Sequence, residues 1–344
     1  MENRFLGIAA SAALLAVSAI PVLAQEAVAP DYKWVKGETA RYRMTIEKQQ
    51  KLTGAVQLDL THSRFYTWSQ QVTDVAPDGT ATVDVKFESA GVHLQIPAQQ
   101  VDFTFDPANP DDEKRRTSPL AAPYTGVVGQ SVSFKVSKKG KLLGVVGFDK
   151  LTQKVLEDLK AAPKGGSFLP LAQDSLGDLL SGQMEGMFRL LPEKPVKPGT
   201  LYKKSKVREA DPALGSLILQ TDYTLAGSEV FNGDDSFKFT YATTKTVEVP
   251  AGAAAPPPSP SGAKLSDAKG AGEFFLSKTK GIVTKNSFQS GTTVETPIPA
   301  PEGGTPSSGT QREDLKVVVE LAPAAEPTAA AGSPATPPPA EPMK

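Results

Sequence analysis

Two histidines and a Ser-x-x-Lys tetrad are the residues whose types most directly suggest catalysis. His62 and His93 are the only histidines, and the sequence contains no cysteine. Two imidazoles without a thiolate do not complete a zinc site of the ordinary ligand types. A histidine-based triad also needs a positioned serine, and no Gly-x-Ser-x-Gly turn occurs. Both histidines stand in strand-like runs beside apolar residues, so we expect each to be structural.

The tetrad begins at Ser277 and ends at Lys280. Acyl-transfer enzymes with this pattern place the serine at a helix start and carry Ser-Asp-Asn and Lys-Thr-Gly companions. Those companions are missing, and the preceding residues 274–276, Phe-Phe-Leu, favour a strand. We interpret the match as chance. The sequence also contains no phosphate-binding loop and no dinucleotide fingerprint.

Four carboxylates cluster in the segment DPANPDDEKRR: Asp106, Asp111, Asp112 and Glu113. Hard oxygen ligands at close spacing are typical of calcium sites. The spacing is not that of a helix-loop-helix calcium loop, however, and three basic residues follow at once. We therefore favour a solvated turn with local ion pairs. A carboxylate pair for glycoside hydrolysis depends on separation in space and cannot be read from sequence.

Apolar side chains give the remaining candidate site. Met184, Met187 and Phe188 form one stripe at helical spacing, and methionine suits irregular or variable apolar contacts. Ordinary core packing is the competing interpretation. Trp68, together with Trp34 and Tyr66, would line a cavity of this kind. The predicted ligand-binding residues are Met184, Met187, Phe188 and Trp68; no catalytic, metal-binding or cofactor-binding residue is predicted.

The elements that must position these residues are mostly strands, because the dominant hydrophobic period is two. The alternating runs are Val56, Leu58 and Leu60; Val83, Val85 and Phe87; Val101, Phe103 and Phe105; Val132, Phe134 and Val136; Phe237, Phe239 and Tyr241; and Val317, Val319 and Leu321. Turn sequences separate such runs at residues 76–79, 138–141 and 232–235. We expect ten or more antiparallel strands in consecutive hairpins.

Two helices are predicted near the middle of the chain. The first starts with Asp149 as its N-cap, repeats Leu151, Val155 and Leu159, and ends before Pro163. The second runs from a cap at residue 174 to a stop at residue 192. A β run, two helices and a second β run form an α+β pattern.

We expect a mostly β, α+β fold: a large curved antiparallel sheet or open barrel, with both helices packed on its concave face. Two small β domains joined by a helical hairpin are the alternative. The sequence does not show whether the sheet closes.

The first 24 residues resemble a secretory signal peptide, with a charged start, an apolar run and a small-residue cleavage pattern. We expect cleavage before Gln25 and a periplasmic or secreted protein without a transmembrane anchor after cleavage. The absence of cysteine excludes disulfides and lipid attachment, so burial must hold the fold. A formal net charge of −1 argues against a nucleic-acid partner.

Three segments lack the apolar bulk needed to offset the entropy of ordering. Residues 250–264 and 296–310 are predicted disordered loops of a single domain spanning residues 25–321, and residues 322–344 are a disordered tail rich in proline and alanine. A proline-rich arm that reaches a partner is the alternative interpretation.

Two segments carry a family resemblance. Residues 129–147, GQSVSFKVSKKGKLLGVVG, and residues 191–200, LPEKPVKPGT, with Tyr202 following, resemble signatures of a family of uncharacterised secreted bacterial proteins, classed as a domain of unknown function. The resemblance spans residues 31–321 and implies no catalytic residue. At the level of the fold, the chain also resembles periplasmic lipoprotein carriers and mycobacterial lipid-binding lipoproteins, which implies an open barrel over an apolar cavity.

Three functional hypotheses follow. The first is an exported, non-enzymatic protein that binds a lipid or another apolar small molecule in the cell envelope, without a cofactor. The second is an envelope scaffold or interaction module with a protein partner, and the third, least favoured, is a hydrolase. A structure with a fully packed interior and no cavity would contradict the first hypothesis.

Overall fold

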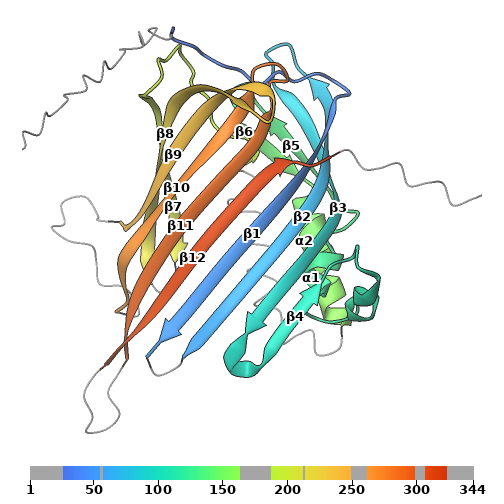
Figure 1. Ribbon diagram of the computed structural model, residues 1–344, viewed down its shortest axis with the longest axis vertical. Helices are drawn as coiled ribbons and strands as arrows, with labels where there is room; N and C mark the ends of the chain where they lie inside the picture. Colours follow the sequence, from blue (N-terminus) through green and yellow to red (C-terminus); the bar gives the residue numbers. More distant parts are fainter. Residues whose placement is uncertain are drawn as a thin grey trace, which may run out of the picture.

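One curved antiparallel sheet dominates the molecule (Figure 1). The computed structural model describes residues 26–54, 57–162, 187–211, 214–248, 262–298 and 307–323. In these ranges the sheet has 12 strands in the order β6-β5-β3-β2-β1-β12-β11-β10-β9-β8-β7, and β4 pairs separately with β3. The two ends of this order are not paired with each other, so the described sheet is open. The predicted mostly β fold class is confirmed.

The strands are β1 (Thr39–Thr53), β2 (Leu58–Val75), β3 (Ala81–Ile96), β4 (Val101–Phe105), β5 (Ser131–Val136), β6 (Leu142–Val146), β7 (Thr200–Asp211), β8 (Gly215–Phe231), β9 (Asp234–Val247), β10 (Lys264–Ser277), β11 (Val283–Ile298) and β12 (Ser307–Leu321). The helices are the 3-10 turns η1 (Pro97–Gln99) and η2 (Pro110–Arg115), and the α-helices α1 (Ala122–Thr125) and α2 (Phe148–Ala161).

Consecutive hairpins build most of the sheet, as the alternating pattern predicts. The turn between β8 and β9 is the clearest case, because Asn232 and Gly233 have φ angles of 50° and 78°. Two successive positive φ angles give the turn the twist of the flanking strands. The predicted turns at residues 76–79 and 138–141 also connect strands, β2 to β3 and β5 to β6.

The first and last strands pair with each other at the centre of the sheet. β1 runs antiparallel to β12 from Tyr42 opposite Leu321 to Thr53 opposite Thr310. Hydrophobic alternation in either strand does not reveal this pairing, because it identifies a face and not a neighbour.

The core lies on the concave face, where one apolar cluster joins strands from both halves of the sheet. Buried side chains of β1 and β2 alternate mostly with half-buried or exposed ones. Among the buried ones, Tyr42 and Trp68 stack with ring centroids 5.7 Å apart. On the opposite half, Phe239 of β9 and Phe274 of β10 stack at 4.6 Å. Further along β1 and β2 the inward residues become polar; they are Lys48, His62 and Arg64, all buried.

The helices α1 and α2 pack on this face beside β3 and β5. α2 buries Leu151, Val155 and Leu159, as predicted, but its N-cap is Gly147 with φ of 91°, two residues before the predicted Asp149 cap. The glycine accepts this role because left-handed backbone costs it little. Most of the predicted second helix lies outside the described residues, and residues 187–191 are not α-helical.

The loop predicted at residues 296–310 is longer than the connection between the two strands in the structure. β11 continues to Ile298 and β12 begins at Ser307, with these two residues paired. Strand pairing supplies backbone hydrogen bonds that a proline- and glycine-rich composition does not reveal. Similarly, Lys264 belongs to β10 and not to the predicted loop. Residues 1–25, 249–261, 299–306 and 324–344 lie outside the described residues, and with them the predicted signal peptide and all of the predicted tail except Ala322 and Pro323.

Two non-strand segments close one end of the concave face. Val28 and Val196 form an isolated antiparallel bridge. Tyr32 donates its backbone N–H to Lys138 and its hydroxyl to Arg189, at 2.9 and 3.1 Å. The segments on either side of the bridge are thereby fixed against the β5–β6 turn. None of the helices in the described residues is long and apolar enough to cross a membrane.

Candidate functional site

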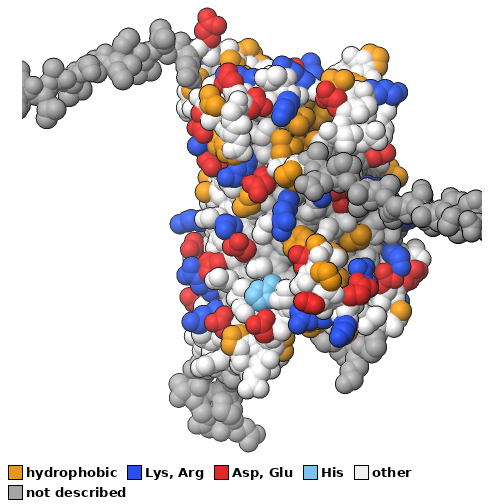
Figure 2. All heavy atoms as spheres, turned by 45° about the vertical axis from the view of Figure 1, so that its right-hand side comes forward, with side chains coloured by type: hydrophobic (Ala, Val, Ile, Leu, Met, Phe, Trp, Pro, Cys, Tyr) orange, Lys and Arg blue, Asp and Glu red, His pale blue; other side chains and the backbone are white. Residues whose placement is uncertain are grey.

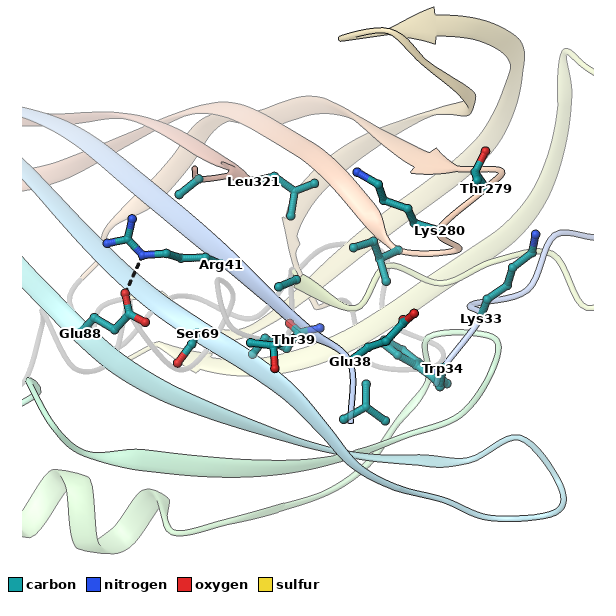
Figure 3. A pocket seen from close by; sticks show the side chains of 15 residues that line it. Lys33, Trp34, Glu38, Thr39, Arg41, Ser69, Glu88, Thr279, Lys280 and Leu321 are labelled. Atoms are coloured by element: carbon teal, nitrogen blue, oxygen red, sulfur yellow. Dashed lines mark hydrogen bonds and ion pairs between the residues drawn. The ribbon is translucent and has the colours of Figure 1, made fainter. Parts of the chain in front are cut away.

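A gap in the sheet wall creates a large open pocket (Figure 3). β1 begins at Thr39, but its pairing with β12 reaches only to Tyr42. Beyond that pair, the start of β1 faces the β10–β11 turn, where Gly281 donates to Ser277 and Ser277 donates to Ile282. The space between them has a volume of about 880 Å³, which is within the range of ligand pockets.

Six apolar, four polar uncharged and five charged residues line this pocket, which we call the side pocket. They are Trp34, Ala40, Val72, Ile282, Leu321 and Ala322; Thr39, Ser69, Gln70 and Thr279; and Lys33, Arg41, Lys280, Glu38 and Glu88.

Trp34 forms the aromatic floor of the side pocket. Its ring stacks on Tyr32 with centroids 4.9 Å apart and planes within 1°, and it meets the edge of Phe188 at 6.1 Å. Only 9% of Trp34 is exposed. Its indole Nε1 is buried without an acceptor among the described residues. The contacts with Tyr32 and Phe188 thus hold the ring in place and give it apolar neighbours.

A second, much smaller cavity lies behind the floor. It has a volume of about 10 Å³, enough for about one water. Trp34, Gln70 and Ile282 line both cavities and therefore form the wall between them. Met187 and Phe188 line the inner cavity. Of these two cavities, the one on the outer side of this wall therefore holds nearly all the volume.

The charges around the side pocket are unevenly compensated. Arg41 Nε lies 2.6 Å from Glu88 Oε2, and Arg41 also donates to the Pro323 carbonyl. Lys33 Nζ donates to the Lys278 carbonyl at 2.5 Å. Within the described residues, the side chain of Lys280 has no ion-pair or hydrogen-bond partner. The rim therefore carries cations that no carboxylate neutralises.

The predicted ligand-binding residues have separate locations. Met184 lies outside the described residues, whereas Met187 and Phe188 are buried in the interior. Trp68 is fully buried against Tyr42 and lines neither cavity. Of the aromatic residues considered from the sequence, Trp34 is the one that reaches the side pocket.

Sequence reasoning missed the rim residues Lys33, Arg41 and Lys280. No local pattern marks them, because they meet only where β1 extends beyond β12. Gln70 was also missed: it sits in phase with Trp68 on the concave face, and alternation in β2 was the available signal.

The histidines occupy two different environments. His62 is buried, and its Nε2 lies 2.8 Å from the Tyr124 hydroxyl. Burial, reinforced by Arg64 and Lys48, lowers its pKa from 6.5 to about 3, so the ring is neutral near pH 7. His93 is exposed on β3, 3.1 Å from Asp102.

The Ser-x-x-Lys tetrad forms the β10–β11 turn. Ser277 is buried at the end of β10, and its Oγ accepts a hydrogen bond from the backbone N–H of Lys280 at 2.9 Å. The serine thus stabilises a turn and does not stand at a helix start, in line with the sequence interpretation.

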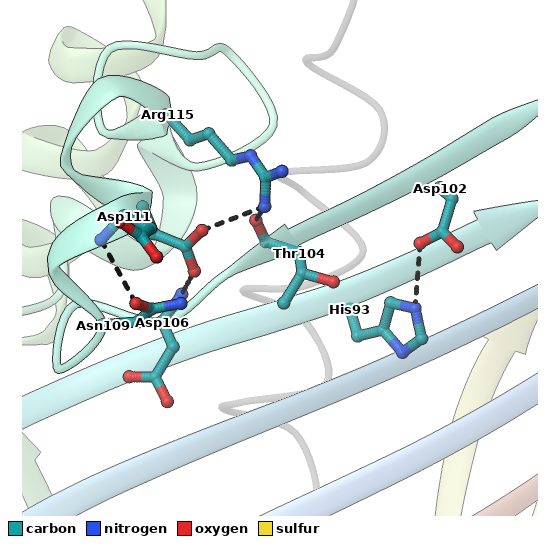
Figure 4. A network of polar contacts seen from close by, with 8 residues as sticks. His93, Asp102, Thr104, Asp106, Asn109, Asp111 and Arg115 are labelled. Atoms are coloured by element: carbon teal, nitrogen blue, oxygen red, sulfur yellow. Dashed lines mark hydrogen bonds and ion pairs between the residues drawn. The ribbon is translucent and has the colours of Figure 1, made fainter.

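The acidic segment forms a turn of local hydrogen bonds and ion pairs (Figure 4). Asp112 is buried; it accepts from the Asp106 backbone at 2.9 Å and pairs with Arg115 at 2.9 Å. The Asn109 side chain caps η2 by accepting from the Asp111 backbone. In the described residues no group of three or more potential metal-ligating side chains is found. The segment is thus an ion-paired turn, as favoured from the sequence, but its central carboxylate Asp112 is buried and not solvated.

The outer surface has a mixed charge. Figure 2 shows acidic and basic side chains interspersed on one face, with hydrophobic side chains gathered toward its upper end. A shallow hollow of about 660 Å³ crosses the convex side of β1, β12, β11 and β10. Ion pairs occupy it, including Lys316 with Glu47 at 3.1 Å. It offers no apolar floor comparable to Trp34.

Comparisons with known proteins give a family for part of the chain. Residues 78–232 match the model of DUF6263, a family of unknown function. This region runs from the β2–β3 turn to the β8–β9 turn and contains both segments that carry the resemblance seen in the sequence. No curated protein matches.

Two solved structures show weak similarity. A lipovitellin structure concerned with lipid–protein interactions is 10% identical, with a TM-score of 0.39; it covers 86% of this chain, which spans only 26% of the lipovitellin chain. A DUF1329 family protein from Desulfovibrio piger is 10% identical over 79% of this chain and 83% of its own, with a TM-score of 0.11. Scores this low do not establish a common fold. The family match is the firmer result: residues 78–232 of this chain are similar to DUF6263, a family of unknown function.

Proposed function

We propose that this protein is an exported, non-enzymatic protein that binds the apolar part of a small ligand in the side pocket. The observation that carries the proposal is the 880 Å³ pocket with the rigid Trp34 ring as its floor. Apolar surface removed from water contributes roughly 25 cal/mol per Å², so an alkyl chain against Trp34, Val72 and Ile282 gains affinity without specific polar contacts.

The proposal of a non-enzymatic role rests on the chemistry of the lining. The pocket residues include no histidine, and of its two carboxylates Glu88 is held by Arg41. A general base must lie within hydrogen-bond reach of the proton it removes and be free to accept it. Glu38 alone meets the second condition among the described lining residues, and it lies at the rim beside the solvent.

The location is proposed from the N-terminal sequence. Residues 1–24 have the features of a signal peptide, which supports a location in the periplasm or outside the cell. Intact-mass analysis of protein recovered from an envelope fraction tests this point: the expected mature chain begins at Gln25. A mass that retains residues 1–24 would contradict export with cleavage.

Tryptophan fluorescence offers a direct test of binding, because the chain has two tryptophans in different environments. Trp34 lies in the side pocket, and Trp68 lies in the core. In Trp68→Phe only Trp34 reports, and in Trp34→Phe only Trp68 reports. Addition of 1-decanol, a neutral alkyl probe, is expected to change the emission of the first variant in a saturable way and leave that of the second unchanged.

A pair of alanine variants controls for non-specific partitioning. Ala40 lines the side pocket, whereas Ala242 is exposed on β9, so Ala40→Phe fills the pocket and Ala242→Phe adds the same ring elsewhere. Decanol binding should be lost only in Ala40→Phe. Equal responses of Trp34 and Trp68, or unchanged binding in Ala40→Phe, would contradict the proposal. If Trp68→Phe does not fold, native mass spectrometry of the two alanine variants with decanol gives the same comparison.

An envelope interaction module is the second candidate, and the edge strand β6 favours it. β6 ends the described strand order, and Leu143, Val145 and Val146 are 49%, 42% and 72% exposed. Exposed edge strands accept a further strand from a partner. Hydrogen exchange tests this: amides of residues 142–146 should become protected when the protein is mixed with solubilised envelope proteins. Unchanged exchange there would argue against strand addition.

A further inference from the structure

The rim of the side pocket holds two lysines whose backbone segments are in direct contact. Lys33 precedes the Trp34 floor, and Lys280 lies in the β10–β11 turn; both line the pocket. The Lys33 backbone N–H donates to the Gly281 carbonyl at 3.0 Å. A Cβ atom on Gly281 would lie 2.3 Å from Lys33 Cβ, so the two segments touch at the one residue that leaves room.

The other charges at the rim do not cancel these two lysines. Arg41 and Glu88 neutralise each other at 2.6 Å. Lys278, in the same turn, is paired with Asp235 at 3.1 Å outside the pocket. Glu38 is the remaining lining carboxylate, and no ion pair joins it to a lysine within the described residues. Two uncompensated lysines against one carboxylate leave the rim positive.

The pocket thus combines an apolar, aromatic floor with a cationic rim. We propose that its ligand is a single-chain anionic amphiphile, whose alkyl part lies against Trp34 and whose carboxylate or phosphate group lies between Lys33 and Lys280. This inference rests on the proposed apolar binding at the same pocket. Lysine ammonium groups bind such anions as mobile point charges, so the rim selects for charge and does not demand one planar headgroup.

Three probes with the same chain length separate charge from apolar binding: decyl phosphate, 1-decanol and decyltrimethylammonium. Binding to the full chain is followed by Trp34 fluorescence and by native mass spectrometry. Decyl phosphate is expected to bind about 10-fold more tightly than decyltrimethylammonium in dilute buffer. The difference should shrink at about 0.3 M salt, because exposed charges are screened over less than about 10 Å under those conditions.

Lysine variants locate the charge effect. Lys280→Gln should weaken decyl phosphate binding about 2- to 5-fold, since an exposed pair contributes little individually. It should leave decanol binding unchanged. Lys150→Gln is the matched control, because Lys150 is an exposed residue of α2 outside the pocket.

Each outcome bears on one claim. Equal affinities for the three probes would overturn the anionic-ligand inference and leave the proposed apolar binding intact. Tighter binding of decyltrimethylammonium would also overturn it and would point to Glu38 as the dominant charge. Failure of every probe, decanol included, would contradict the proposed function itself.

Discussion

Tyr42 of β1 lies opposite Leu321 of β12, and this pair ends the ladder that joins the first strand to the last. One residue further on, the Ala322 backbone N–H donates to the Arg41 carbonyl at 2.8 Å, after which the strands separate. The pair therefore marks both the completion of the sheet and the edge of the side pocket. Changes to β12 should affect stability and binding together.

Two truncated chains show whether the fold needs the last strand, β12, or the residues that follow it. Ending the chain after residue 323 should retain the fold, because β12 remains complete. Ending it after residue 306 removes a central strand and leaves β1 and β11 with open edges, so a cooperative thermal transition should disappear. Circular dichroism with temperature checks both chains. A cooperative transition in the shorter chain at the full-length midpoint would show that β12 is dispensable.

Acid should destabilise the protein partly through His62. Its folded pKa is about 3 against an ordinary value of 6.5, so between these values the unfolded chain binds a proton that the folded chain does not. The contribution of neutral, buried His62 to the free energy of unfolding is therefore fully present above pH 6.5, and it decreases as the pH falls toward 3. From pH 7 to 4.5 the loss should be about 1–3 kcal/mol.

Urea unfolding at several pH values isolates this effect. The stability difference between wild type and His62→Gln should shrink by that amount as the pH falls. The exposed His93→Gln serves as the control and should track the wild type. Parallel pH profiles for wild type and His62→Gln would refute the buried-histidine account.

The stacked pair Phe239 and Phe274 should be among the costliest positions to truncate. Both rings are fully buried. Phe274→Ala should lower the free energy of unfolding by about 3–5 kcal/mol. Val230→Ala, at a position 72% exposed, should change it by less than about 0.5 kcal/mol. A double-mutant cycle on the two phenylalanines should give a coupling of about 0.5–1.5 kcal/mol, and additive losses would mean that the stacking contributes nothing of its own.

Alanine substitutions at two glycines with similar backbone angles test how tightly the segments that close the concave face are packed. Gly140 and Gly199 have φ of 77° and 80°. A Cβ on Gly140 would lie 2.1 Å from the Arg189 carbonyl oxygen, whereas one on Gly199 meets nothing within 4 Å. Gly199→Ala should cost about 1 kcal/mol through backbone strain alone, and Gly140→Ala at least about 2 kcal/mol more. Chemical denaturation compares them; equal losses would show that the segment around Arg189 adapts freely.

The apolar edge of β6 should promote association between molecules. Val145→Lys places a charge on this edge, a common natural device against strand-to-strand pairing. Light scattering of concentrated protein should show less self-association for this variant than for wild type. Val207→Lys on β7, at the opposite end of the sheet, offers a comparison at an edge that already carries several basic residues. Equal association of wild type and Val145→Lys would exclude β6 as the contact.

Local patterns in the sequence predicted several of the strands, three of the turns and one helix. Alternation at Val83, Val85 and Phe87 identified an inward face because burial depends on the period of the side chains. The Asn232-Gly233 pair identified a turn because positive φ restricts the residue type. Both properties are carried by neighbouring residues, so a single sequence contains them.

The candidate site depended on contacts that no local pattern encodes. Trp34 was considered only as one of three aromatic residues that would line a cavity. Lys33 and Lys280 reach the same pocket because the Lys33 backbone binds Gly281, a residue distant in the chain. Likewise, the predicted role of Trp68 did not anticipate its stacking on Tyr42. Which aromatic ring is enclosed and which one lines a pocket is decided by where neighbouring strands end.

Because β1 pairs with β12, the first strand cannot complete its pairing until the last strand has been synthesised. Glu47 and Lys316 face each other across this pair of strands, although 269 residues separate them in the chain. Pairings of such separation form slowly, since a long loop must be closed before any contact is gained. An emerging chain therefore carries β1 as an unsatisfied edge until nearly its whole length has been made. During that interval the unpaired edge of β1 is open to pairing with other chains, and the arrival of the final strand ends this exposure.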